Sequence, residues 1–455
     1  MKVDTARSET PERSALNGWH TLPSLPSLPE VFRSIPVPKS ATFWRRLLAF
    51  VGPGYLVAVG YMDPGNWATD IGGGAAFAYR LLSVVLISSL MAVFLQALSA
   101  KLGIATGRDL AQACRDTYKK PIVIFLWLSA EIGIVACDIA EVIGAAIALN
   151  LLFHIPLAAG VILTGLDVLL LLALQHKGFR WIEGIVITLI ATIMAVFCIE
   201  LFYAHPSFHA VIAGFVPHRD IVQNAGMLYI ALGILGATVM PHNLYLHSSV
   251  VQTRDFGESW EDKKDAVRMA QTDSFVALML ALFVNAAILI LAAATFYRTG
   301  HHEITGIQDA YRMLTPLLGV SLATPLFAIG LLASGQNSTL TGTLAGQIIL
   351  EGFLHIRIAP WLRRLISRGL AIVPAATAVI LYGARGIDQL MLFSQVVLSM
   401  QLPLAVIPLI QITGDRRRMG PLVNGRIVQI VGVLLAVLIV VLNAWLIVTS
   451  LHGGH

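Results

Sequence analysis

The tetrapeptides Asp63-Pro-Gly-Asn66 and Met240-Pro-His-Asn243 interrupt two otherwise apolar stretches of the chain. Proline has no N–H group, so a proline inside a helix leaves the carbonyl four residues earlier without its helical partner. The two prolines release the carbonyls of Gly60 and Ala237 in this way. A simple proline kink would not require Asp and Asn in one break and Met, His and Asn in the other. We therefore interpret both motifs as functional breaks in membrane helices.

The rest of the chain has the composition of a membrane protein. Of its 455 residues, 56% are hydrophobic and only 13% are charged, and the mean hydropathy is +0.76. An ordinary soluble domain carries about 25% charged residues, so this composition excludes a soluble enzyme and any disordered or collagen-like class. Apolar runs long enough to cross a bilayer predict eleven transmembrane helices. They lie near 47–75, 79–103, 121–148, 154–174, 181–204, 223–251, 273–297, 317–350, 366–384, 388–412 and 427–450.

The positive charges give the orientation of these helices. With the N-terminus inside, the inside segments hold 26 of the 31 Lys and Arg residues and the outside segments hold 5. Cytoplasmic loops carry such an excess, which predicts a multi-pass protein of the cytoplasmic membrane with the N-terminus in the cytoplasm and the C-terminus outside. The same placement explains the net charge of +5 without a nucleic-acid partner, and it makes the lipid bilayer the expected surroundings.

The chain divides into a short polar segment and one membrane domain. Residues 1–42 are rich in Pro and Ser and have no continuous apolar run, which predicts a flexible cytoplasmic tail rather than a signal peptide. Residues 43–450 form the predicted transmembrane domain. Spans 1 and 6 carry the breaks and begin on opposite sides, which predicts an inverted repeat of five spans each, about 47–204 and 223–412, with helix 427–450 appended. In such folds a matched pair of broken helices marks the substrate site near the midplane.

The two breaks together offer an unusual ligand set. A carboxylate buried in a membrane, such as that of Asp63, needs a cation, a proton or a basic partner. If the breaks meet, Asp63, the Asn66 amide and the two released carbonyls supply oxygen, and Met240 supplies a thioether. Oxygen ligands suit Mg²⁺, Ca²⁺ and Mn²⁺, whereas a soft thioether favours transition metals. The mixed set predicts a site for Mn²⁺ or Fe²⁺.

Span 3 carries three acids whose spacing puts them on one helical face: Glu131, Asp138 and Glu141. Carboxylates in this arrangement are costly in a membrane and indicate a proton or ion path. The alternative is that they pair with buried basic side chains and hold helices together, and both roles can coexist. The candidate partners at the start of span 9 are Arg363, Arg364 and Arg368. His242 either passes a proton or stabilises its break by hydrogen bonding, and Asp63 is a candidate first proton acceptor.

The quoted motifs resemble those of a known family. Asp63-Pro-Gly-Asn66 and the segment Gly236–Ser249 are similar to the hallmark motifs of the Nramp family of proton-coupled divalent-metal transporters, and 335–347 resembles the family's stretch in span 8. The likeness runs from about residue 43 to 450. It implies an all-α, LeuT-like fold and, in a bacterial inner membrane, proton-coupled import of Mn²⁺ and Fe²⁺ by alternating access. It implies no enzymatic activity and no cofactor.

The resemblance also implies roles for individual residues. The metal ligands fall on Asp63, Asn66, Met240 and the carbonyls of Ala237 and Gly60. Gln395 in span 10 is implied as a ligand of the outward-facing state, and a structural hydrogen bond between helices is an equal alternative. Proton exit falls on the span 3 acids with Arg368, while Arg363 and Arg364 are left unranked.

Three rival functions remain to be weighed against this interpretation. A transporter of the same fold for Mg²⁺ or a Na⁺-coupled small solute is disfavoured by Met240 together with Asp63. An intramembrane hydrolase lacks a recognisable motif, such as HExxH. A channel does not need a pair of broken helices related by a repeat. The choice between Mn²⁺ and Fe²⁺, the proton stoichiometry and the oligomeric state stay open at this level.

Overall fold

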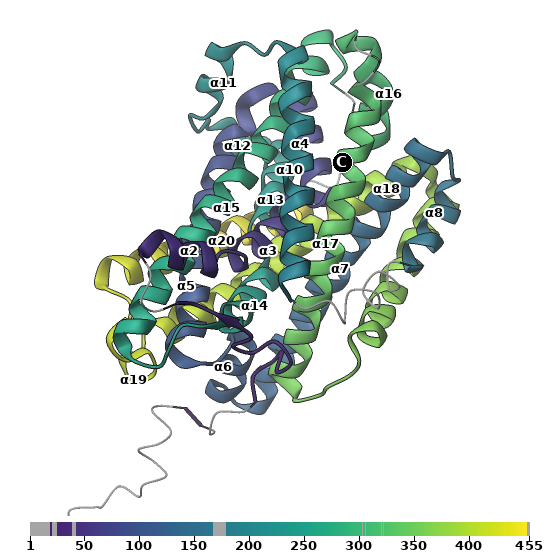
Figure 1. Cartoon of the computed structure of the whole chain (residues 1–455). Coiled ribbons are helices and arrows are strands. Elements are labelled where there is room, and N and C mark those ends of the chain that lie inside the picture. Colours follow the sequence, from purple (N-terminus) through teal and green to yellow (C-terminus); the bar gives the residue numbers. More distant parts are fainter. Residues whose placement is uncertain are drawn as a thin grey trace, which may run out of the picture.

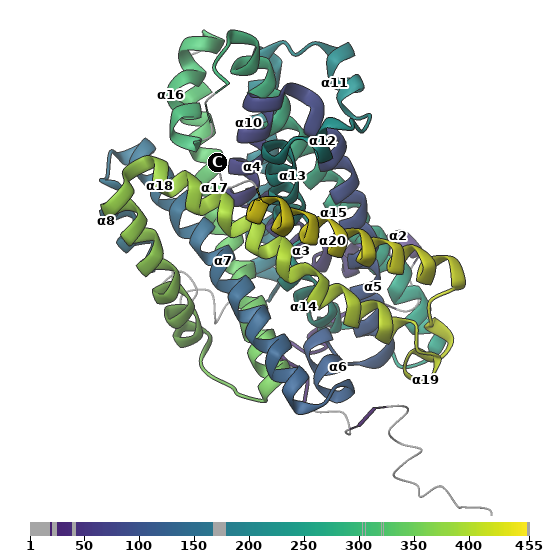
Figure 2. The ribbon, with the colours of Figure 1, turned by 180° about the vertical axis from the view of Figure 1, so that it is seen from behind.

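Long helices make up almost the whole molecule (Figures 1 and 2). The structure is a computed structural model that describes residues 19–20, 25–38, 42–166, 179–302, 304, 306–319, 321 and 323–452. The first part contains β1 (Ile35–Pro36), α2 (Phe43–Phe50), α3 (Pro53–Val59), η1 (Gly60–Met62), α4 (Pro64–Phe77), η2 (Ala78–Leu81), α5 (Leu82–Thr106), α6 (Leu110–Thr117), α7 (Lys120–Phe153), α8 (Leu157–Leu163) and η3 (Thr164–Leu166).

The second part continues with the remaining helices and one more two-residue strand. These are α10 (Phe179–Ala204), α11 (Phe208–Gly214), α12 (Asp220–Gln223), α13 (Ala225–Thr238), α14 (Pro241–Val250), η4 (Val251–Thr253), β2 (Arg254–Asp255), α15 (Trp260–Thr295), η5 (Tyr297–Thr299), α16 (Ile307–Leu318), α17 (Ala323–Leu354), α18 (Pro360–Thr413), α19 (Arg416–Met419), η6 (Gly420–Leu422) and α20 (Arg426–His452). Helix α18 is two helices that meet at Gly383, whose φ of 63° only glycine adopts readily.

Both predicted helix breaks are present. The first broken helix consists of α3, the 3₁₀ turn η1 and α4, and the second consists of α13 and α14. Asp63 has extended backbone angles and caps α4, whose first residue is Pro64. Pro241 likewise opens α14, after Met240 leaves the helical conformation. Proline suits the first position of a helix because its missing N–H is not needed there, so each motif ends one helix and begins the next.

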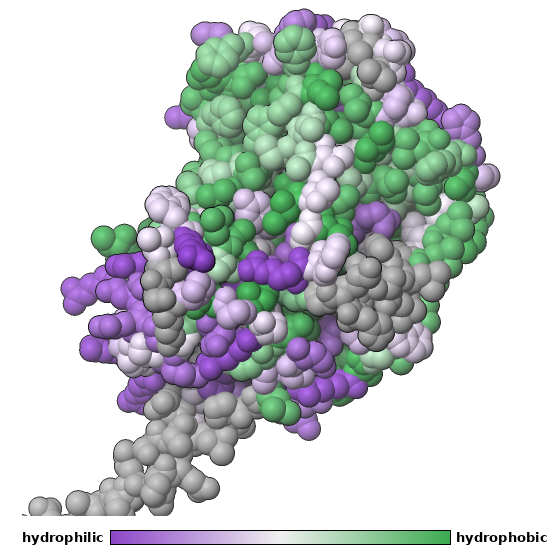
Figure 3. Space-filling view, in the orientation of Figure 1, coloured by the Kyte–Doolittle hydropathy of each residue, from purple (hydrophilic) through white to green (hydrophobic). Residues whose placement is uncertain are grey.

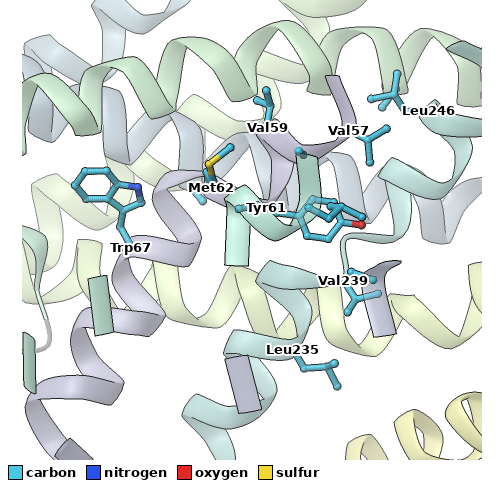
Figure 4. Packing of buried hydrophobic residues seen from close by; sticks show 14 of the residues in the cluster. Val57, Val59, Tyr61, Met62, Trp67, Leu235, Val239 and Leu246 are labelled. Carbon is cyan, nitrogen blue, oxygen red and sulfur yellow. The ribbon is translucent and has the colours of Figure 1, made fainter. Parts of the chain in front are cut away.

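Helix α7 is one of the helices against which several others pack. It contacts α17 and α18 extensively, and both broken helices contact it as well. Figure 4 shows side chains of the two broken helices, among them Val57, Trp67 and Leu235, in one buried cluster. The ring of Trp67 lies 4.8 Å from that of Phe197 on α10 and 5.0 Å from that of Phe327 on α17. Packing of this kind fixes the first broken helix within the bundle.

The surface agrees with a protein that lies in a bilayer. Among the described residues, eight helices are long and apolar enough to cross a membrane. Helix α17 is as long but carries the polar stretch 335–347. The predicted span near 154–174 begins as α8 and η3, and its last part lies outside the described residues. In Figure 3 hydrophobic residues cover most of the upper part, while hydrophilic residues gather at the lower end.

The segment before the bundle corrects one expectation. Residues 25–38 do not form a flexible tail, because β1 pairs in parallel with β2 and the side chains of Leu28, Ile35 and Val37 are buried. Trp19 is buried too. We call the end of the bundle formed by α6, α19 and this segment the N-terminal face (Figure 1). The other residues of 1–42, apart from His20 and Thr42, lie outside the described part of the chain.

Arg254 joins three elements near the N-terminal face. Its guanidinium is fully buried, donates to the carbonyls of Phe50 at 2.9 Å and Val51 at 2.8 Å, and lies 2.7 Å from a Glu183 oxygen on α10. Nearby, the carboxylate of Asp273 on α15 accepts the N–H of Gly54 at 2.7 Å. The beginning of α3 is therefore held by charged groups of α10 and α15 and by Arg254, the first residue of β2.

We call the contacts of Arg254 with Phe50, Val51 and Glu183 the joint, and substituting Arg254 tests whether it stabilises the fold. Removing one partner of a buried ion pair leaves the other charge unpaired and costs about 3–5 kcal/mol, whereas an exposed pair contributes less than about 1 kcal/mol. We expect Arg254→Ala to lower the melting temperature of the detergent-purified protein markedly. Arg80→Ala, which breaks the exposed pair with Asp220, should change it little. Equal melting temperatures for the two variants would show that the buried joint does not stabilise the fold.

Candidate functional site

The first break brings a carboxylate and an amide together inside the bundle. Asp63 and Asn66 are fully buried, and Asp63 Oδ1 accepts the backbone N–H of Asn66 at 2.9 Å. This bond is the usual cap of a helix N-terminus, so it follows from the local sequence. Asp63 Oδ2 has no hydrogen-bond partner among the described residues. A buried carboxylate oxygen without a donor is costly unless a proton or a cation satisfies it.

Asn66 links the first break to the second. With its nitrogen turned toward them, its side-chain amide donates to Asp63 Oδ1 at 2.6 Å and to the Ala237 carbonyl at 3.2 Å. Its oxygen then accepts from the Asn285 amide of α15 at 3.1 Å. The same Asn285 nitrogen donates to the Tyr61 carbonyl at 2.8 Å. The predicted meeting of Asp63, Asn66 and the carbonyl released by Pro241 is therefore seen in the structure.

Two glycines let polar side chains approach the first break. A Cβ atom at Gly65 would lie 2.1 Å from Gln395 Nε2, so the Gln395 side chain of α18 rests directly on the backbone of the motif. A Cβ atom at Gly60 would lie 2.2 Å from Asn243 Nδ2, which places the second break against the first. The Gln395 nitrogen donates to Ser394, and its oxygen has no partner among the described residues. Gln395 thus has an oxygen to offer beside the motif.

Met240 lies at the second break and faces α7. Its side chain is fully buried and packs with Ala136 and Cys137 of α7 and Leu398 of α18. Pro64 of the first break touches the same helix, since a Cβ atom at Gly144 would lie 2.2 Å from the proline ring. The offset of seven residues from Cys137 to Gly144 corresponds to about 10 Å along a helix. The two breaks therefore contact α7 about two turns apart.

The span 3 acids form ion pairs with the span 9 arginines. Arg364 reaches Asp138 at 2.5 Å and Glu141 at 2.9 Å, and Arg368 lies 3.4 Å from Glu141. All four side chains are at most 1% exposed. Arg363 pairs with Glu131 at 2.6 Å, where the acid is 19% exposed. The alternative of structural pairing is thus seen in the geometry, and Arg364, which the sequence left unranked, is the residue that joins two acids.

Hydroxyl groups of α17 complete this network. Ser338 donates to Glu141 Oε1 at 2.6 Å, and Arg368 donates to Thr339 at 2.8 Å. Neither hydroxyl could be assigned from the sequence, although both fall in the polar stretch 335–347. Asp63 and Glu141 lie close enough to interact electrostatically. The ion pairs are therefore next to the first break rather than a separate feature.

The two histidines of the second broken helix differ in their surroundings. His242 is buried, its Nδ1 has no partner among the described residues, and it lies within electrostatic range of Asp138. His247 is held on both sides, with Nδ1 3.0 Å from Gln96 Oε1 and Nε2 3.2 Å from Ser274 Oγ. Gln96 in turn donates to the Tyr61 hydroxyl at 2.7 Å. The His247 contacts, which sequence spacing could not reveal, connect the second broken helix to the first through α5.

This arrangement suits reversible binding of a cation. Within the described ranges, no group of three or more His, Cys, Asp or Glu side chains lies close enough to hold a metal ion. The site instead offers one carboxylate, amide and carbonyl oxygens, and a thioether. A single negative charge with neutral ligands attracts a divalent ion without cancelling its charge, so the ion can also leave.

Comparisons with known proteins agree with the geometry. The family model described as natural resistance-associated macrophage protein-like, Nramp, matches residues 54–449. A protein of Listeria monocytogenes named divalent metal cation transporter MntH is 59% identical over 433 residues, which cover 95% of this chain and 97% of that protein. A protein of the same name from a Nostoc species is 58% identical, with 94% and 97% covered. These relatives are named as transporters rather than enzymes.

Solved structures confirm the predicted all-α, LeuT-like fold. The crystal structure of the manganese transporter of Eremococcus coleocola, in complex with an aromatic bis-isothiourea substituted compound, superposes with a TM-score of 0.85 at 41% identity and covers 94% of this chain and 92% of its own. Mhp1, a nucleobase-cation-symport-1 family transporter, superposes with a TM-score of 0.57 at 16% identity, covers 88% of this chain and 93% of its own, and shows the fold alone. With a family model that spans the membrane domain and relatives this similar along nearly their whole length, the chain belongs to the Nramp family.

Proposed function

We propose that this protein imports Mn²⁺, and also Fe²⁺, across the inner membrane of a bacterium, by alternating access and together with protons. The names of its relatives, a divalent metal cation transporter and a manganese transporter, support the substrate class. The observation that carries the proposal is the Asn66 amide, which bridges Asp63 and the Ala237 carbonyl across two broken helices. This amide brings together the Asp63 and Ala237 oxygen atoms that would coordinate a divalent ion.

The proposed ligands are Asp63, Asn66, Met240, the carbonyls of Ala237 and Gly60 and, in the outward-facing state, Gln395. A cation that binds Asp63 and Ala237 would displace the N–H donor of Asn66 and turn its amide, so that the amide oxygen faces the ion. The same ligand set with only oxygen atoms would suit Ca²⁺ and Mg²⁺ equally. Met240 is therefore the residue we assign to selectivity for transition metals.

Uptake into proteoliposomes tests the ligand assignment. We expect Asp63→Ala to abolish Mn²⁺ uptake, because it removes the only charged ligand. Met240→Ala should weaken Mn²⁺ uptake and let excess Ca²⁺ or Mg²⁺ compete, since a purely hard site no longer discriminates. Met269→Ala is the matched control, because Met269 is equally buried but packs near Phe50 at the N-terminal face. Full discrimination by Met240→Ala would refute its role, and a wild type that ignores Mn²⁺ would refute the substrate.

The proposed proton route runs from Asp63 and His242 to Asp138 and Glu141, with Arg364 and Arg368 as basic partners and Glu131 with Arg363 toward the N-terminal face. The electrostatic proximity of Asp63 to Glu141 supports it. A dication that arrives at Asp63 repels a proton there, and the acids of α7 are candidate acceptors because Glu141 lies within electrostatic range of Asp63. Structural pairing and proton transfer are compatible, because an ion-paired carboxylate can still titrate.

Removing the titratable group of Glu141 tests the coupling. In the wild type we expect Mn²⁺ uptake to be faster at acidic than at neutral external pH and to acidify vesicles that contain a pH-sensitive dye. Glu141→Gln keeps the shape of the side chain but cannot exchange a proton, so it should lose the Mn²⁺-dependent acidification. An equal uptake rate at both pH values in the wild type, without acidification, would disprove proton coupling.

Removing Arg364 should destabilise the protein more than removing Arg363. Arg364→Ala leaves two buried acids with one basic partner fewer, which costs about 3–5 kcal/mol and should lower the melting temperature. Arg363→Ala affects a partly exposed pair and should lower it less. Arg364→Lys keeps the charge but lacks the forked guanidinium that reaches both acids. Compared with Arg364→Ala, it should therefore restore the melting temperature more fully than it restores proton coupling. Equal melting temperatures for the two alanine variants would contradict this ranking.

We further propose that the N-terminal face is cytoplasmic. The excess of Lys and Arg in the segments assigned to the inside supports this orientation. The C-terminus then lies outside, and the inner halves of the broken helices, α3 and α14, lie toward the cytoplasm.

A further inference from the structure

The strap, as we call residues 25–38, crosses the N-terminal face. At its beginning, Ser27 donates to Asp109 at 2.5 Å, and the Gln112 side chain donates to the Leu25 carbonyl at 2.9 Å. Both partners belong to the start of α6. Arg357, in the connection between α17 and α18, donates to the Pro26 carbonyl at 3.3 Å. The first part of the strap therefore joins α6 to the α17–α18 connection.

The end of the strap is bound to the segment that follows the second broken helix, η4 and β2. The backbone N–H of Arg33 donates to the Gln252 carbonyl at 3.0 Å, and that of Val37 donates to the Asp255 carbonyl at 3.2 Å. Between them, Ile35 is in register with Arg254. Arg254 is also the residue that holds the carbonyls before α3 and the carboxylate of Glu183. The strap is thus attached to the joint that keeps α3 and the end of α14 in place.

We propose that the strap is an intramolecular latch that keeps the cytoplasmic mouth of the transporter closed and must be released for the ion to leave. The proposal rests on the alternating access and orientation proposed above. Asp63 and Met240 are fully buried in this arrangement. Because the strap is bound to the segment after α14 at one end and to the α17–α18 connection at the other, we infer that the whole strap leaves the N-terminal face when these two parts separate.

Ser27 is the contact most sensitive to charge. Its side chain is buried, and Asp109, which caps α6, is fully buried as well. Burial raises the pKa of Asp109 to about 6, and the hydrogen bond from Ser27 is the largest of the interactions that lower it. The hydrogen bonds from Ser27 and the Gln112 backbone, together with the nearby Arg115, favour the charged form of Asp109. A second carboxylate at position 27 would face it at hydrogen-bonding distance and expel the strap.

Thiol labelling measures release of the strap without any metal. The reporter is Val37→Cys, buried at 5% exposure, in a chain whose Cys114, Cys137 and Cys198 are replaced by alanine. Adding Ser27→Asp should raise the labelling rate at least about tenfold, as expected when two like charges replace a buried hydrogen bond. Ser34→Asp is the matched control, because Ser34 is exposed on the same strap and should change the rate less than about twofold. Equal rates for the two aspartate variants would overturn the latch.

A disulfide that holds the strap in place tests the opposite change. Pro36 and Asp255 are both exposed and are neighbours in register, so cysteines at these positions meet the geometric demand of a disulfide. In the cysteine-free background, oxidation of Pro36→Cys/Asp255→Cys should slow Mn²⁺ uptake about tenfold, and a reductant should restore it. Each single-cysteine variant is the control.

The two experiments separate the latch from the transport proposal. Full uptake with the strap cross-linked would overturn the latch while leaving metal transport intact. If the protein does not move Mn²⁺ at all, the proposed function fails in the uptake experiment, and the labelling experiment still decides whether the strap is released by charge at Ser27.

Discussion

The bond between the Asp63 carboxylate and the Asn66 backbone is the interaction on which the site depends. A helix that starts in the middle of a bundle exposes N–H groups that water cannot reach, and a capping carboxylate satisfies one of them. The same carboxylate keeps its second oxygen free of protein donors among the described residues. The residue that makes the break tolerable is therefore also the residue that we propose as its charged ligand.

The ion pairs beside this break are balanced in charge. Three acids of α7, Glu131, Asp138 and Glu141, meet three arginines of α18, with Arg364 shared between two of the acids. Charges this deeply buried persist only when they are paired, so one added proton leaves an excess positive charge that must be relieved. In the proposed mechanism, that imbalance is what sends a proton onward.

Local sequence was enough to predict the breaks, and three-dimensional packing decided the rest. Pro64 and Pro241 act on their own neighbours, so the missing N–H of each proline was enough to locate both breaks. Arg364 could not be distinguished from Arg363, because the rotation of α18 against α7 determines which arginine meets Asp138. The strap was missed for a similar reason: its Pro- and Ser-rich composition predicts disorder, but Asp109, Gln112 and Arg254 supply the partners.

Helix α7 explains how metal and proton could depend on each other. Pro64 of the first break and Met240 of the second both touch it, and Glu141 lies between these two contacts along the helix. In the proposed mechanism, a movement of α4 or α14 against α7 changes the surroundings of Glu141 together with the distance between the proposed metal ligands. Because one helix carries the acids and supports both breaks, one displacement would alter the proposed metal site and the start of the proposed proton route together.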